Sequence, residues 1–80
     1  MRKNLTSVNV TVTYQVDDNG NIFPLSITWK DGRSWNIQRV LHTCQSPDMS
    51  FKGIRYTILI DGEEKYLYRD NLHWYVLVPI

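Results

Sequence analysis

The sequence predicts a small all-β domain, an antiparallel meander of about six strands that forms a small SH3-like barrel or a strongly curled sheet. Three observations predict this class. Apolar and polar residues alternate with period two through most of the chain, as they do in strands with one buried face. Turn signals separate these segments at short intervals, and no segment has a helical pattern of useful length. With 80 residues the chain suits one domain, so we place residues 1–80 in a single domain.

The N-terminal part of the chain predicts two strands joined by a turn. Ser7–Val16 places its valines on one face and its polar residues on the other. Asp17–Asn21 follows as a turn cluster that contains Gly20, which tolerates positive φ. The next strand runs from about Ile22 to Lys30. Pro24 cannot donate a ladder hydrogen bond, so we expect an edge or a bulge there.

Asp-Gly pairs mark two of the later turns. Asp31-Gly32 predicts a two-residue hairpin of type I′, and Asp61-Gly62 a second Asp-Gly turn. In the strand after Gly32 the alternation breaks at the adjacent apolar residues Val40 and Leu41. We therefore expect a bulge or bend near Arg39.

The remaining segments complete the meander. Thr43–Lys52 is the one long stretch without strand character, so it is the natural place for a functional loop. Three strands follow, over about Ile54–Ile60, Glu64–Arg69 and Leu72–Val78. The residues that we expect to point inward are Val8, Val10, Val12, Phe23, Leu25, Ile27, Trp29, Trp35, Ile37, Ile54, Tyr56, Ile58, Trp74 and Val76.

Composition excludes several classes of protein. Hydrophobic residues make up 42% of the chain and charged residues 21%, which is typical of a globular domain. The formal net charge of +1 provides no long-range attraction to polyanions. No stretch approaches the length of an apolar membrane helix, and Arg2 and Lys3 precede an alternating segment rather than the apolar core of a signal peptide. With one cysteine and no disulfide, the sequence predicts a soluble, cytoplasmic protein.

From Ile27 onward, turn glycines and core aromatics form four segments: Ile27-x-Trp29-x-Asp31-Gly32-Arg33, Gly53-Ile54-Arg55-Tyr56-Thr57, Tyr66-Leu67-Tyr68 and Trp74-Tyr75-Val76. In these segments, roughly the last two-thirds of the chain resembles a family of small, uncharacterised proteins of Gram-positive bacteria. The resemblance implies an all-β fold. It also implies a DNA-related setting, because genes of that family are often neighbours of translesion DNA polymerases or lie on mobile elements. It assigns no catalytic residue.

The sequence offers only weak candidates for catalysis or metal binding. Cys44 has His42 and His73 as candidate bases, but no third residue at a recognisable spacing. The same three residues, with Asp48 or Asp70, have no paired metal-ligand spacing. The adjacent acids Asp17-Asp18 and Glu63-Glu64 fall in predicted turns. We therefore predict no enzyme, no cofactor, no metal site and no small-molecule substrate.

Nucleic-acid binding is the first functional hypothesis. The acids gather in the predicted turns, whereas the cations lie on the strands. Cations interleaved with aromatic rings on a sheet form a surface on which bases stack and phosphates pair. The alternative is a solvated, salt-bridged face with half-buried tyrosines. The residues that we expect to contact nucleic acid, or a DNA-handling protein, are Arg33, Arg39, Arg55, Lys65, Arg69 and Tyr75.

The C-terminal segment Trp74–Ile80 carries the second hypothesis, because it is apolar on both faces. Such a run is typical of a strand buried on both sides. An exposed strand of this kind would instead be covered by a second copy or a protein partner. The sequence thus leaves open a central strand, a homodimer or a protein–protein interaction module.

Overall fold

A computed structural model describes residues 4–45 and 51–80 of the chain. It contains eight strands, and within these two ranges no residue is helical. The strands are β1 (Leu5–Asn9), β2 (Thr11–Val16), β3 (Ile22–Thr28), β4 (Ser34–Asn36), β5 (Arg39–Gln45), β6 (Ile54–Ile60), β7 (Glu63–Asp70) and β8 (His73–Pro79). The all-β prediction is confirmed.

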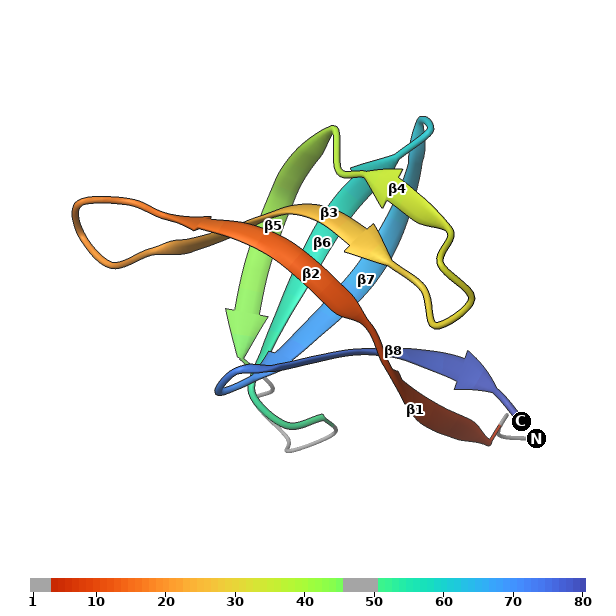
Figure 1. Cartoon of the computed structure of the whole chain (residues 1–80). Coiled ribbons are helices and arrows are strands. Elements are labelled where there is room, and N and C mark those ends of the chain that lie inside the picture. The colour runs from red at the N-terminus through yellow and green to blue at the C-terminus, as the bar shows by residue number, and fades with distance from the viewer. Residues whose placement is uncertain (1–3, 46–50) are drawn as a thin grey trace.

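The strands form two antiparallel sheets (Figure 1). One has five strands in the order β1-β8-β7-β6-β5, and the other has three in the order β2-β3-β4. Over the described ranges the sheets do not close into a barrel. The ladder between β7 and β8 joins only Tyr68–Asp70 to His73–Tyr75, although both strands continue beyond these pairs. The apolar strand β8 lies inside its sheet, between β1 and β7.

Two of the expected strands are each divided, which is why eight strands replace six. Ser7–Val16 divides at Val10, whose N–H donates to the carbonyl of Trp74 at 3.1 Å. The second division lies between β4 and β5. There the N–H of Ile37 donates to the carbonyl of Leu25 in the three-stranded sheet. The N–H of Gln38 donates to the carbonyl of Leu59 in the five-stranded sheet, and both distances are 2.8 Å. At both corners the chain passes from one sheet to the other.

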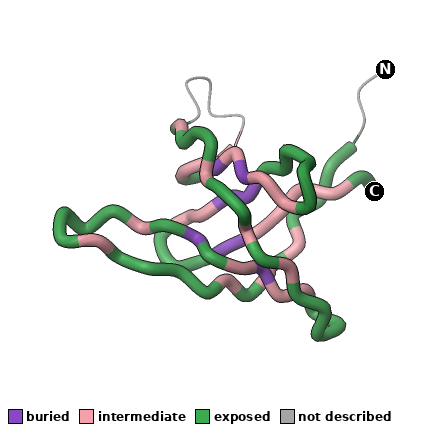
Figure 2. Tube along the Cα trace, turned by 90° about the horizontal axis from the view of Figure 1, so that it is seen from above, coloured by how far each residue is buried: buried purple, intermediate pink, exposed green. Residues whose placement is uncertain are grey.

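The core lies between the two sheets (Figure 2). Its buried residues are Ile27, Tyr56, Ile58, Leu67 and Trp74. The expected inward positions of Phe23 and Leu25 are wrong, because these side chains are 41% and 45% exposed. The register shifts between Thr13 and Tyr14, which leaves Leu25 without a partner on β2. This bulge at Pro24 and Leu25 reverses the alternation, so that Pro24 is buried instead.

The two Asp-Gly turns differ. Asp61 and Gly62 have φ of 50° and 77°, as a two-residue type I′ turn requires. In the other turn, however, Gly32 has a φ of 90° and Asp31 does not have a positive φ. The prediction of a type I′ turn at Asp31-Gly32 is therefore wrong. The loop there spans three residues, since the N–H of Trp29 donates to the carbonyl of Arg33 at 2.8 Å.

The connection between β5 and β6 begins later than expected. Thr43–Gln45, predicted as part of a loop, belongs to β5, and residues 46–50, including Asp48, lie outside the described residues. The bulge predicted near Arg39 lies two residues further on, at Leu41, where the register shifts between Val40 and His42.

Candidate functional site

One row of side chains crosses all five strands of the larger sheet. In the register, Cys44 of β5 lies opposite Arg55 of β6, and Arg55 lies opposite Tyr68 of β7. Tyr68 in turn faces Tyr75 of β8, which faces Asn9 of β1. Side chains opposite each other in a sheet point to the same face. Because Trp74 and Leu67 have the other phase and lie in the core, this row lies on the opposite surface, which we name the outer face.

Four aromatic rings and one guanidinium gather on the outer face. We name them the aromatic–arginine cluster: Phe51, Arg55, Tyr66, Tyr68 and Tyr75. The rings of Tyr68 and Tyr75 stack with centroids 5.1 Å apart and an interplanar angle of 14°. Phe51 meets Tyr68 edge-on at 5.2 Å. The Cζ of Arg55 lies 4.5 Å from the centroid of Tyr66 and 5.3 Å from that of Phe51, within cation–π range of both.

Neighbouring groups bury one ring of the cluster and hydrogen-bond another. Tyr68 is only 5% exposed, and burial raises the pKa of its hydroxyl while the charge of Arg55 opposes that rise. The hydroxyl of Tyr75 donates to the carbonyl of Lys52 at 2.8 Å. Tyr66 remains half exposed. Tyr75 is therefore oriented by its hydrogen bond and by its stacking on the buried Tyr68, whereas Tyr66 remains open to solvent.

A shallow groove of about 470 Å³ adjoins the cluster. Its lining includes the aromatic residues Phe51 and Tyr75, the polar residues His73 and Asn9, the cation Lys52 and the acid Asp70. Aromatic faces can stack a planar base, an amide can pair with its edge, and an ammonium can contact a phosphate. The groove thus combines aromatic residues, an amide residue and a cation, with one acid, Asp70, beside them.

The structure brings together only part of the predicted site. Arg55 and Tyr75 belong to the cluster. Arg39 lies opposite Leu59 of β6, so it shares the outer face. Leu59 is four residues beyond Arg55 on β6, so Arg39 lies away from the cluster. Lys65 and Arg69 have the phase of Leu67 and point to the inner side of the sheet.

Three of the predicted cations outside the cluster, Arg69, Lys65 and Arg33, already have partners. Arg69 donates from Nε to the hydroxyl of Tyr56 at 3.0 Å and from Nη1 to the carbonyl of Asn71 at 2.8 Å. The Nζ of Lys65 pairs with Glu63 at 3.2 Å. Arg33 lies beyond the larger sheet, in the loop before β4, where its Nε pairs with Asp31 at 2.7 Å.

Sequence reasoning missed Phe51, Tyr66 and Tyr68 as members of the site. The sequence contains a signal for the two tyrosines, because strict alternation places them on the opposite face of the strand from Lys65 and Arg69. Only the pairing register shows that they share a face with Arg55. Phe51 precedes β6 and is not in a strand, so no alternation could place it.

The residues considered for catalysis do not form a site. His42 and Cys44 lie on the outer face of β5, and strands β6 and β7 separate them from His73 on β8. Cys44 is a free, partly buried thiol. In the part of the chain that the structure describes, no three His, Cys, Asp or Glu side chains come together as metal ligands.

No protein-family model, curated protein or solved structure matches this chain. The described ranges also contain no helix that is long and apolar enough to cross a membrane.

Proposed function

We propose that the protein is a non-enzymatic binding module that holds single-stranded nucleic acid on its outer face. The observation that carries this proposal is the stacked pair of Tyr68 and Tyr75 beside Arg55, with Tyr75 lining a groove to which His73 and Lys52 also contribute. The resemblance to proteins encoded near DNA polymerases, described above, adds a DNA-related setting. We also propose that the protein acts in the cytoplasm, in line with its free Cys44.

The expected binding depends more on stacking than on charge. A base stacked on an aromatic side chain contributes about 1–3 kcal/mol. Arg55 and Lys52 are the two cations of the site, and each phosphate contact to a single strand adds about −0.7 to the slope of log K against log salt. We therefore expect a footprint of a few nucleotides and a shallow salt dependence.

The test is an anisotropy titration with labelled single-stranded and double-stranded oligonucleotides at about 50 mM and about 200 mM salt. We expect binding to the single strand, weakened by salt. Tyr75→Ala removes the stacking ring and should weaken binding roughly tenfold. Arg55→Gln should reduce the salt slope.

Two matched controls accompany these variants. Tyr75→Phe keeps the ring but removes the hydrogen bond to Lys52, so it should retain most of the affinity. Arg33→Gln changes the same kind of side chain in the loop before β4, away from the outer face, and should leave the titration unchanged. No binding at low salt, or equal losses in Arg33→Gln and Arg55→Gln, would refute the proposal.

A protein partner bound through Trp74–Ile80 is the second function that we propose. It is supported by the course of β8, which pairs with β1 from Tyr75 to Pro79 but leaves β7 after Tyr75. We interpret the two sheets as an SH3-like barrel opened at this position. Light scattering over a range of concentrations distinguishes a homodimer from a monomer that binds another protein.

A further inference from the structure

The separation of β7 from β8 leaves two strand edges facing a gap, which we name the seam. The carbonyl of Trp74 accepts from Val10 on the side of β1. Because backbone groups alternate in direction along a strand, those of Tyr75 and Leu77 point toward β7. Tyr68 is the partner of Tyr75, so on β7 the residues in phase with Tyr68 turn their N–H and C=O groups toward β8. Glu64 and Tyr66 have this phase, and they lie beyond the last residue pair of the ladder.

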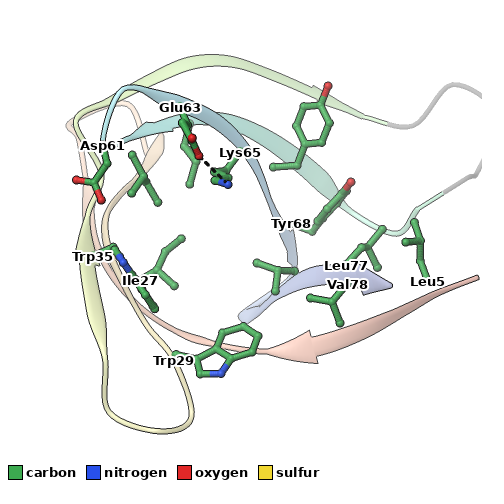
Figure 3. A pocket seen from close by; sticks show the side chains of 14 residues that line it. Leu5, Ile27, Trp29, Trp35, Asp61, Glu63, Lys65, Tyr68, Leu77 and Val78 are labelled. Atoms are coloured by element: carbon green, nitrogen blue, oxygen red, sulfur yellow. Dashed lines mark ion pairs between the residues drawn. The ribbon is translucent and has the colours of Figure 1, made fainter. Parts of the chain in front are cut away.

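Behind the seam lies a largely apolar cavity of about 660 Å³ between the two sheets. Both sheets contribute to its wall, through Ile27, Trp29 and Trp35 on one side and Ile58 and Val76 on the other. Figure 3 shows Trp29, Trp35 and Ile27 around this space, with Leu77 and Val78 across from them. Its volume lies within the range of pockets that hold ligands. An open strand edge and an apolar cavity thus adjoin each other.

The charges along the cavity are mainly negative. Asp61, Glu63 and Lys65 are the charged residues in its lining, and Glu63 is paired with Lys65 at 3.2 Å (Figure 3). This pair is solvent-exposed, so it is screened and rearranges easily. The negative charge of Asp61 remains uncompensated, in the turn that precedes β7. A basic side chain of a ligand would therefore be attracted to this end of the seam.

We propose that the seam binds an extended segment of another protein, which adds a strand antiparallel to β7. This inference rests on the second proposed function and deepens it by naming the chemistry of the partner. The backbone of the segment pairs with Glu64 and Tyr66, as strands do when they augment an open sheet edge. Its inward side chain enters the cavity, and a lysine or arginine reaches Glu63 and Asp61.

The antiparallel direction fixes the order of these features in the segment. The residue opposite Lys65 points to the inner side of the sheet, as Lys65 does, and it is apolar. The residue opposite Glu63 comes two positions later, and it carries the positive charge. The residues opposite Glu64 and Tyr66 point to the outer face, and their N–H groups pair with β7. The partner therefore alternates, with a basic residue two positions after an apolar one.

The first test uses a labelled, capped nonapeptide that alternates threonine with isoleucine and has a lysine in place of its last isoleucine. N-methylation removes one backbone donor at a time. We expect methylation of the central threonines to weaken binding about tenfold each, because their N–H groups face β7. Methylation of an isoleucine should have little effect. Equal losses at both kinds of position would overturn strand pairing.

The second test compares two exposed acids, one at the seam and one far from it. Glu63→Gln should weaken binding of the lysine peptide about fivefold at low salt and leave a glutamine-for-lysine peptide unaffected. Asp18→Asn removes the same charge in the exposed turn between β2 and β3, so it is the matched control and should leave both affinities unchanged. If the two variants behave alike, the position of the basic residue is wrong.

Amide chemical shifts and light scattering separate this inference from the function on which it rests. Peptide-induced shifts at Glu64, Tyr66 and Leu77 support it. Shifts confined to the outer face around Tyr75 would overturn the seam as the site but leave a protein-binding function intact. A concentration-dependent dimer that does not bind the peptide would identify a second copy as the occupant and overturn the inference. A strict monomer that does not bind the peptide would overturn the inference.

Discussion

The hairpins β2–β3 and β6–β7 have similar alternation in sequence but different positions in the molecule. In β6–β7, Tyr56, Ile58 and Leu67 are almost fully buried. In β2–β3 only Pro24 and Ile27 are buried, and the far end of the hairpin extends beyond the rest of the molecule (Figure 1).

The difference teaches that alternation defines which residues share a face but not whether that face is covered. Hairpin β6–β7 has a neighbouring strand on each side, β5 and β8, and the smaller sheet packs against its inner face. Hairpin β2–β3 has β4 as its one neighbour. Its bulge at Leu25 also turns Leu25 and Phe23 to solvent.

The largest expected effect contrasts a leucine from each hairpin. Leu67→Ala should lower the free energy of unfolding by about 3 kcal/mol, because a fully buried leucine leaves a cavity. Leu25→Ala should cost less than about 1 kcal/mol, since the side chain is already half exposed. Urea unfolding followed by tryptophan fluorescence measures both. If Leu67→Ala does not fold, Ile58→Val, expected near 1 kcal/mol, replaces it. Similar losses for Leu67→Ala and Leu25→Ala would contradict the comparison.

A pair of glycines should show the same contrast. A Cβ at Gly53, just before β6, would meet the carbonyl oxygen of Arg69 on β7, and its φ of 83° is unfavourable for alanine. We expect Gly53→Ala to cost about 2–3 kcal/mol. Gly20, in the β2–β3 turn, has a similar φ but open space around it, so Gly20→Ala should cost about 1 kcal/mol. The difference between the two losses in stability measures the effect of the close approach to Arg69. Equal losses would show that the backbone of β7 moves aside at little cost.

The smallest effect concerns pH at the two turns. Hydrogen bonds from the backbone and side chain of Asn21 and the backbone of Asn19 hold the pKa of Asp17 below its ordinary 3.8. A lowered pKa stabilises the folded turn above pH 3.8, and that contribution is lost as the pH falls through the folded-state value. A carboxyl titration by NMR should report it.

The turn of β6–β7 and a variant provide the controls for this titration. In that turn the N–H of Gly62 donates to the side-chain amide of Gln38 at 2.8 Å, and an amide does not titrate. Loosening on acidification should therefore appear at the tip of β2–β3 and disappear in Asp17→Asn. An equal acid response at Gly62 would contradict this explanation.

Much of the fold follows from local pattern, and the errors have local causes. Period two correctly predicts β6, β7 and β8, and Asp61-Gly62 forms the expected turn. It fails at Val10, because a corner between sheets interrupts hydrogen bonding without interrupting the alternation. It fails at Phe23 because a bulge one residue long exchanges the two faces of a strand.

The candidate site could be predicted less completely than the fold. The sequence places Arg55 opposite the core residues, as the structure does. It does not contain the register that brings Tyr68 and Tyr75 beside Arg55, because register depends on turn geometry and bulges along both strands. The seam is harder still to predict from the sequence, since it depends on the residue at which β8 stops pairing with β7.

The ladder between β1 and β8 has a kinetic consequence. Leu5 pairs with Pro79 and Asn9 with Tyr75, so this ladder joins segments separated by nearly the whole chain. Closing so long a loop costs conformational entropy, and the contacts of the ladder compensate this cost only once the ladder is complete. Such contacts therefore slow folding. We expect β6–β7, joined by a two-residue turn, to form early on the pathway and the docking of β1 to be its last and slowest event.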